Sequence, residues 1–161
     1  MRWSIFIVLS LILGVFFWMW GGSEISKEIP FYYQKIMGKT ISLEINGAKI
    51  NAEIAKSQAE KIKGLSNRDE LASDRGMIFV YDQEEIPSFW LKETRFPLDI
   101  IWIKDDVIVD LTENAPIDAG PNFKTYSPKT AVTRVLEVNA GFCQKQGIAV
   151  GQKVLYSKKI K

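Results

Sequence analysis

The first part of the chain is a continuous apolar run, whereas the rest alternates between apolar and polar positions. The run extends from Trp3 to Trp20 and contains no charged residue. As a helix it would span about 27 Å, close to the roughly 30 Å hydrocarbon core of a bilayer. Trp3, Trp18 and Trp20 stand at its two ends, where indole rings favour the headgroup region. Residues 1–20 are therefore predicted to be a single-pass transmembrane anchor.

A cleaved signal peptide is the alternative interpretation of this run. Gly21 and Ser23 would supply small residues before a cleavage site, but the apolar core is longer than in most signal peptides and ends in bulky side chains. Lys27, Lys35 and Lys39 follow the run, so a plain count of cations would place the domain inside. The immediate flank, residues 21–24, carries no cation, and the start of the chain is signal-like. We therefore expect a membrane protein whose domain is extracytoplasmic.

A stalk and then a globular domain are predicted after the anchor. Residues 21–38 begin with two glycines, contain Pro30 and mix both charges, which favours a linker, and the domain is expected over residues 39–161. It opens with two alternating runs around Asn46-Gly47, the strongest short signal for a β-hairpin because both turn positions need a positive φ. Ser57 to Glu60 then forms a capping box, which predicts a short helix ending at Gly64.

The remainder of the domain is read as mainly strands. A second hairpin is predicted around Asp105-Asp106, a long irregular loop around Pro116, Pro121 and Pro128, and a helical turn over residues 140–147. Further strands are predicted at 76–81, 88–92, 99–104, 107–112, 132–138 and 150–156. Short, closely spaced strands with one or two short helices predict a mostly β fold, a compact antiparallel sandwich or barrel.

Composition restricts the chemistry that this domain could perform. The sequence has no histidine and one cysteine, which excludes Ser-His-Asp and Cys-His catalysis, imidazole metal sites and thiolate-cluster zinc sites. The net charge of +2 shows no basic excess, so nucleic acid is not an expected partner. No metal or cofactor is predicted. Cys143 is expected to be a buried apolar side chain beside Phe142, although an exposed thiol could pair between chains.

An ordered set of motifs resembles a known family, the uncharacterised domain of unknown function 192. The resemblance covers about residues 45–156 and implies a compact, mostly β fold, often behind a signal or membrane anchor, without an established activity. Ser66 and Leu91 stand where the family commonly has methionine, and Glu93 where it has asparagine. The motifs that carry it are Gly64-Leu65 with Arg68, Leu71, Gly76-Met77-Ile78-Phe79, Phe89 to Thr94, Pro97-Leu98-Asp99, Leu136 to Gly141, and Gly147-Ile148 with Val150-Gly151.

The segment from Phe89 to Asp99 is the most unusual in the domain. If Phe89 to Glu93 is a strand, Trp90 and Lys92 lie on one face, where an aromatic ring beside a cation would clamp a planar or sugar-like ligand. The alternative is a packed surface pair, in which the lysine stem covers the indole.

Polar residues within apolar sequence complete the candidate site. Asp99 follows Leu98, and Glu137 lies between two apolar residues, so either carboxylate would need a partner such as Arg68 or Lys92 if buried. These residues would be internal ion pairs in one interpretation and a ligand pocket in the other. The candidate ligand-binding residues are Arg68, Trp90, Lys92, Thr94, Asp99 and Glu137.

Two functions follow from these candidates. The first is a non-catalytic binding or accessory module of the cell envelope, whose partner is a polar ligand or an envelope protein. The second is an envelope hydrolase of the glycoside type, with Asp99 and either Glu93 or Glu137 as its carboxylate pair. Metal binding at Asp105, Asp106 and Asp110 is not expected, because these residues do not form the ligand ladder of a calcium loop.

Overall fold

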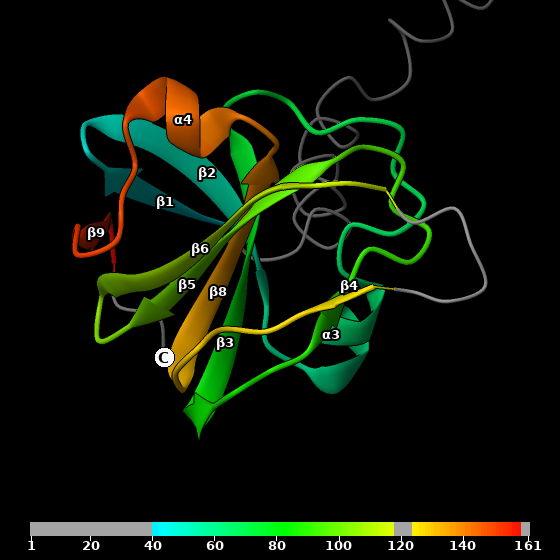
Figure 1. The fold of residues 1–161 in the computed structure, drawn as a ribbon, viewed down its shortest axis with the longest axis horizontal. Coiled ribbons are helices and arrows are strands. Elements are labelled where there is room, and N and C mark those ends of the chain that lie inside the picture. The colour runs from blue at the N-terminus through cyan, green and yellow to red at the C-terminus, as the bar shows by residue number, and fades with distance from the viewer. Residues whose placement is uncertain (1–39, 118–123, 159–161) are drawn as a thin grey trace, which may run out of the picture. The chain divides into compact units, whose positions relative to one another are not determined.

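The computed structural model describes residues 40–117 and 124–158, which form a mostly β domain with two short helices (Figure 1). The predicted anchor and stalk, residues 1–38, lie outside these ranges. Within them, no helix is both long and apolar enough to cross a bilayer. In chain order the elements are β1 (Thr40–Ile45), β2 (Ala48–Ala55), α3 (Gln58–Lys63), β3 (Arg75–Glu85), β4 (Phe89–Trp90), β5 (Leu98–Lys104), β6 (Val107–Ala115), β7 (Thr125–Tyr126), β8 (Val132–Asn139), α4 (Phe142–Gln146) and β9 (Val154–Tyr156).

Seven strands form one curled sheet in the order β6-β5-β8-β3-β2-β1-β9. The two edges approach one another at one end, where Val107 and Lys153 form an isolated bridge. The sheet is thus a half-barrel rather than two stacked sheets. β4 and β7 pair separately as a small two-stranded sheet.

One strand pair departs from the predicted antiparallel arrangement. β2 and β3 are parallel, with Asn51 beside Arg75 and Ala55 beside Phe79. Parallel neighbours need a long crossover, and residues 56–74, which include α3, provide it. The predicted pattern of short strands therefore holds, but the expectation of a wholly antiparallel sheet is wrong at this pair.

Both predicted hairpin turns have the backbone geometry that their sequences indicate. Asn46 and Gly47 have φ of 50° and 81°, and Asp105 and Asp106 have φ of 48° and 63°. Such values at both central positions favour the tight turns that match the twist of the strands. The capping box is also present, because the Ser57 side chain accepts from the Glu60 N–H while the Glu60 carboxylate accepts from the Ser57 N–H.

Other segments differ in extent from the prediction. β4 contains only Phe89 and Trp90, because the chain turns after Leu91 and Glu93 adopts a φ of 59°. β9 begins only at Val154, because turns precede it. β3 continues to Glu85, four residues beyond its predicted end at Tyr81.

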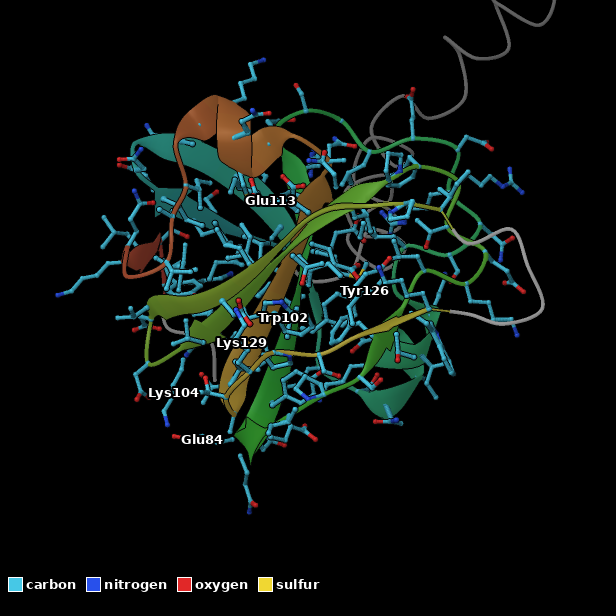
Figure 2. The ribbon with its side chains drawn as sticks, in the orientation of Figure 1. Glu84, Trp102, Lys104, Glu113, Tyr126 and Lys129 are labelled. Atoms are coloured by element: carbon cyan, nitrogen blue, oxygen red, sulfur yellow. The ribbon has the colours of Figure 1, made fainter. Side chains whose placement is uncertain are left out.

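The central strands are buried on both faces, and two apolar cores result. One lies inside the curl and includes Ile101, Leu136 and Cys143. The other lies on the opposite face and includes Phe79, Ile100 and Trp102, which is labelled in Figure 2. Burial on both sides explains why Leu98 to Ile103 read as apolar with a single interruption, Asp99.

Candidate functional site

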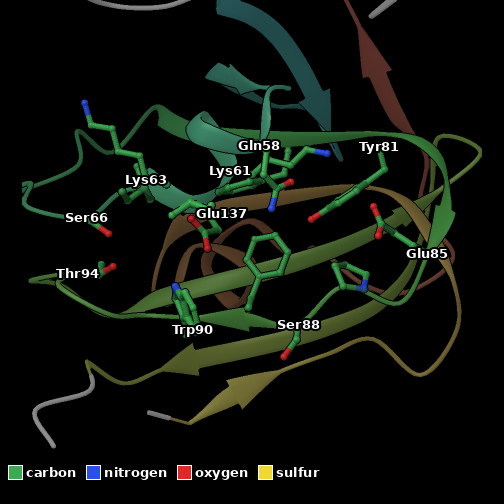
Figure 3. Close-up of a pocket in the computed structure, with 16 residues that line it drawn as sticks. Gln58, Lys61, Lys63, Ser66, Tyr81, Glu85, Ser88, Trp90, Thr94 and Glu137 are labelled. Carbon is green, nitrogen blue, oxygen red and sulfur yellow. The ribbon is translucent and has the colours of Figure 1, made fainter. Parts of the chain in front are cut away.

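A pocket of about 410 Å³ opens on the face of the sheet that carries the second core (Figure 3). Its walls come from α3 and the loop after it, from β3, from the segment leading into β4, and from β8. Four aromatic residues, Phe79, Tyr81, Phe89 and Trp90, line it. Its polar lining comprises Gln58, Lys61, Lys63, Ser66, Glu85, Ser88, Thr94 and Glu137.

The alternation of side chains along β3 provides one aromatic wall. Met77, Phe79 and Tyr81 are two residues apart and therefore project from the same face. Phe89 meets Phe79 edge to face, with ring centroids 4.8 Å apart, and also meets Trp102 at 5.5 Å. These perpendicular contacts hold the Phe89 ring beside the cavity. Trp90, by contrast, is 50% exposed at the pocket mouth.

Glu137 is the buried polar residue of the pocket. It lies on β8 directly opposite Met77 of β3 and Ile100 of β5, and so shares their face. Only 3% of the residue is exposed, and its carboxyl group points into the pocket in Figure 3. No hydrogen bond or ion pair joins that carboxyl to another residue of the described ranges. Burial raises the pKa of Glu137 to about 8, which favours the neutral carboxyl at pH 7.

Neighbouring residues respond to the same environment. The pKa of the Tyr81 phenol is raised by burial first and then by the charges of Glu85 and Glu137. Lys61 places its ammonium 3.9 Å from the centroid of the Tyr81 ring. Gly76 allows β3 to approach β8 closely, because a Cβ there would lie 2.7 Å from the backbone oxygen of Glu137. The close strand spacing thus fixes the backbone from which Glu137 projects.

Asp99 lies on the opposite face of the sheet, beneath the start of α4. It pairs with Val138, whereas Glu137 pairs with Ile100, so the two carboxylates project in opposite directions. The Asp99 carboxylate is completely buried and accepts backbone N–H groups of Asn114 at 2.8 Å, Gly141 at 3.2 Å and Cys143 at 2.8 Å. The hypothesis of an Asp99–Glu137 carboxylate pair across an open cleft is therefore wrong.

Arg68 contacts neither of these acids. Its guanidinium donates two hydrogen bonds to the Glu53 carboxylate on β2, at 2.5 and 2.8 Å. The hydrogen bond from Glu53 raises the pKa of Arg68, against the lowering effect of burial. Arg68 is thus part of an internal ion pair, which is one of the two interpretations of the sequence. The suggestion that it pairs with Asp99 or Glu137 is wrong.

The remaining candidates divide between the pocket and the surface. Trp90 and the buried Thr94 line the pocket together with Glu137. Lys92 is exposed and is not among the lining residues, although its carbonyl accepts a hydrogen bond from Ser66. The structure therefore brings three of the six candidates to one cavity and assigns Arg68 and Asp99 to other contacts.

Sequence reasoning missed the part of the pocket formed by α3 and β3. The alternation of Phe79 and Tyr81 was visible, but it could not show that Glu137 shares their face, because that depends on which strands pair. Gln58 and Lys61 reach the pocket only because the crossover packs α3 beside β3.

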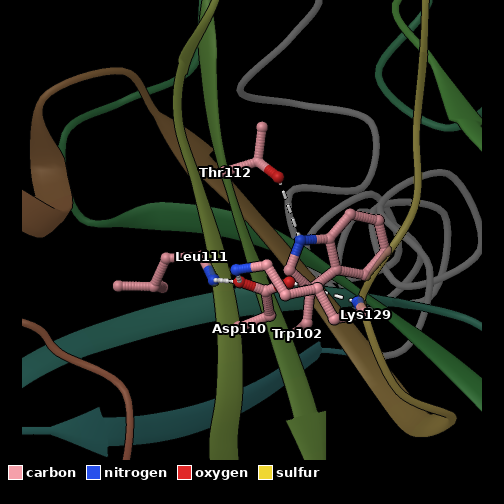
Figure 4. Close-up of polar contacts among 5 residues, drawn as sticks. All are labelled: Trp102, Asp110, Leu111, Thr112 and Lys129. Carbon is pink, nitrogen blue, oxygen red and sulfur yellow. Dashed lines mark hydrogen bonds and ion pairs between the residues drawn. The ribbon is translucent and has the colours of Figure 1, made fainter.

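Several other polar groups of the described residues serve the fold. Trp102 donates its indole N–H to Thr112 at 3.1 Å, and Asp110 accepts from the backbone of Leu111 and from Lys129 (Figure 4). Burial raises the pKa of Asp110, but these hydrogen bonds outweigh it and leave the pKa lowered. Asp106 pairs with Arg134. No cluster of three metal-ligating side chains occurs among residues 40–117 and 124–158.

Cys143 is buried in the first core, as the sequence predicted. Burial is the main cause that raises the pKa of its thiol, and Asp99 adds to the effect. A neutral, inaccessible thiol is a poor nucleophile and a poor partner for a disulfide between chains.

Comparisons with known proteins identify a family but no ligand. The model of the family domain of unknown function 192, described as an uncharacterized ACR, matches residues 41–156. A crystal structure from Sinorhizobium meliloti 1021, described as a proposed transcription regulator, is 25% identical over 74% of this chain and 95% of its own, with a TM-score of 0.69. A protein of unknown function from Novosphingobium aromaticivorans DSM 12444 is 30% identical over 73% of this chain and 85% of its own, with a TM-score of 0.66. None of the curated proteins matches.

Proposed function

The chain belongs to the uncharacterized family domain of unknown function 192, so we propose its function from the pocket itself. The domain is a binding module that takes one small ligand into the pocket between α3, β3 and β8. The aromatic residues contact the apolar part of the ligand, and Glu137 contacts a polar group at the buried end. Thr94 and Gln58 add further hydrogen-bonding groups to the lining.

The observation that carries this proposal is the lack of a partner for Glu137 within the described part of the chain. A buried carboxyl without a hydrogen bond costs the fold free energy, and most buried polar groups in proteins are satisfied. A ligand group that met this carboxyl would recover that cost upon binding. Aromatic walls with a few convergent polar groups are also typical of small-molecule sites.

The glycoside hydrolase alternative loses its support, because both of its carboxylate pairs include Asp99, which is completely buried. It required two carboxylates facing one another across an open cleft, but Asp99 and Glu137 project from opposite faces of the sheet. Three backbone N–H groups also occupy the Asp99 carboxylate. A module that binds without turnover accounts for the same residues with fewer requirements.

The location of this module is a separate part of the proposal. The apolar run from Trp3 to Trp20 supports attachment to a membrane, and the signal-like start with a cation-free flank at residues 21–24 supports a domain on the outer side. A cysteine introduced at the exposed Ser157 would test this with a membrane-impermeant maleimide on intact cells, since the native Cys143 is buried. Labelling of intact cells is expected. Labelling only after lysis would overturn the assignment to the outer side.

A ligand screen with a blocked pocket tests the binding function. The full-length chain in lipid nanodiscs would be screened by ligand-observed NMR against small amines, carboxylates, amides and sugars. Ser88→Trp introduces a bulky side chain at the pocket lining, and Ser157→Trp, outside the pocket lining, is the matched control. We expect at least one class to bind the native chain and the control but not Ser88→Trp. Equal binding to all three chains, or no binding at all, would contradict the proposal.

A further inference from the structure

We infer that the ligand of this pocket carries a protonated amine on an aromatic or apolar stem, and that Glu137 receives the amine. This inference rests on the proposed function and specifies its ligand class. It follows from three features of the described residues: the unpaired buried carboxyl, the aromatic walls around it, and the positions of the charges that already line the cavity.

The carboxyl of Glu137 is the first feature. At 3% exposure it cannot ionise cheaply without a neighbouring cation, because the charged form is poorly solvated there. A partner of opposite charge offsets this cost more than a neutral group does, since charge-assisted hydrogen bonds are roughly twice as strong as neutral ones. An ammonium group also offers several donors to the two carboxylate oxygens.

The aromatic lining is the second feature. Phe79, Phe89 and Trp90 border the same cavity as Glu137. The faces of such rings attract cations, and this attraction increases when the cation is withdrawn from water. The cavity already shows this preference at its edge, where the Lys61 ammonium lies over the Tyr81 ring. Aromatic walls around a carboxyl thus favour an amine over a carboxylate or a phosphate.

The existing charges are the third feature. The titratable and charged side chains that line the cavity with Glu137 are Lys61 and Lys63 from α3, and Tyr81 and Glu85 from β3. Lys61 is engaged with the Tyr81 ring, and the amine of the exposed Lys63 points away from the pocket in Figure 3. Burial alone accounts for the perturbation of Glu137, so neither lysine acts as its counter-ion. The cation that pairs with this carboxyl therefore comes from the ligand.

Proton release upon binding follows from this arrangement. Below pH 8 the empty pocket holds a neutral Glu137, with a pKa of about 8. The neutral carboxyl and the protonated amine combine to give a carboxylate–ammonium pair, and the carboxyl proton leaves to the solvent. Affinity should therefore rise about tenfold per pH unit between pH 6 and pH 7, and then level off near pH 8.

Calorimetric titration of the full-length chain in nanodiscs tests the inference with three probes that share a skeleton. Phenethylamine is cationic, N-acetylphenethylamine is neutral and phenylpropionate is anionic. We expect the cationic probe to bind at least tenfold more tightly than the others at pH 7.5. Its binding enthalpy should depend on the ionisation enthalpy of the buffer, which reports the released proton.

Two variants separate the effect of Glu137 from that of the overall charge of the domain. Glu137→Gln should weaken binding of the cationic probe at least tenfold and abolish its pH dependence. Asp69→Asn, which removes an exposed carboxylate outside the pocket lining, should leave both nearly unchanged. Urea unfolding of each variant confirms that it is folded.

The outcomes distinguish the inference from the proposed function. Comparable binding of all three probes, lost in Ser88→Trp but retained in Glu137→Gln, would overturn the amine assignment and leave the pocket as the binding site. Cationic binding without proton release would also overturn it. Binding of no probe by the native chain would contradict the amine assignment; only if the wider ligand screen also found no class sensitive to Ser88→Trp would the proposed function itself fall.

Discussion

Two buried carboxyl groups on adjacent strands show how one sheet treats similar residues differently. Asp99 on β5 and Glu137 on β8 are nearly diagonal neighbours, and both are almost completely buried. Asp99 projects beneath α4 and accepts three backbone N–H groups. Glu137 projects from the other face into a cavity, without a hydrogen bond from the described residues.

This contrast shows that burial of an acid does not by itself indicate a functional site. Asp99 satisfies N–H groups at the beginning of α4 and near the end of β6, so its carboxylate stabilises the fold. Glu137 makes no hydrogen bond with the described residues through which it would stabilise the fold. Its neutral form is favoured up to about pH 8. Burial thus accompanies a structural role at Asp99, whereas at Glu137 it leaves a carboxyl for which we propose a ligand.

The largest expected effect comes from removing the satisfied acid. Asp99→Ala would leave three buried N–H groups without an acceptor, so we expect it to lower the free energy of unfolding by about 4 kcal/mol. Urea unfolding of the full-length chain measures this loss. Asp69→Ala is the matched control, because Asp69 is an exposed acid in a surface ion pair with Arg95. Similar stability of the two variants would contradict the structural role of Asp99.

The second effect has the opposite sign and depends on pH. The pKa of Glu137 rises from 4.5 to about 8 on folding, so the unfolded chain ionises first as the pH increases. Its contribution to stability is therefore fully present below about pH 4.5, declines up to pH 8 and is then constant. Glu137→Gln removes this decline and should stabilise the domain by about 3 kcal/mol at pH 7 but by less than about 1 kcal/mol at pH 5. A variant that was less stable than the native chain at pH 7 would show that the Glu137 carboxyl is paired.

A third, smaller effect concerns Glu53, an acid whose setting differs from those of both Asp99 and Glu137. Arg68→Ala breaks the half-buried ion pair with Glu53 and should cost about 1–2 kcal/mol in the free energy of unfolding. Ligand binding should be unchanged, because Arg68 is not among the pocket-lining residues. Unfolding and calorimetric titration of the same sample measure both. Loss of affinity at unchanged stability would show that Arg68 contributes to ligand binding.

The smallest effect on stability should accompany a clear effect on binding. Trp90 is half exposed, so Trp90→Ala should lower the free energy of unfolding by less than about 1 kcal/mol. The lost aromatic contact at the pocket mouth should nevertheless weaken phenethylamine binding about tenfold. Val150→Ala, at another half-exposed apolar position, is the control. Equal affinities of the two variants would remove Trp90 from the site.

Local sequence signals predicted the local structure of this domain well. Asn46-Gly47 and Asp105-Asp106 mark two tight turns, and Ser57 with Glu60 caps α3, because these features depend on residues near in sequence. The parallel β2–β3 pair was not predicted, since it depends on the path of the crossover between distant segments. The family resemblance from residue 45 to residue 156 is confirmed by the match over residues 41–156.

The candidate site was predicted only in part, and the reason is strand register. Glu137, Trp90 and Thr94 were identified from sequence and lie in one cavity. Asp99 was grouped with them because buried acids look alike in a sequence, yet a shift of one residue in the β5–β8 pairing decides which face each occupies. Tyr81 and Lys61 were missed because their place beside Glu137 arises only when β3, β8 and α3 come together.

The ionisation of Glu137 without added ligand tests most directly whether this carboxyl is neutral and unpaired in the folded domain. The side-chain carboxyl carbon would be followed by ¹³C NMR from pH 3 to pH 10 in the full-length chain, and Glu137→Gln would assign its signal. We expect a midpoint near pH 8 that falls when phenethylamine is added. A midpoint near the ordinary value of 4.5 would mean that the carboxyl is solvated or already paired, and would contradict the central claim.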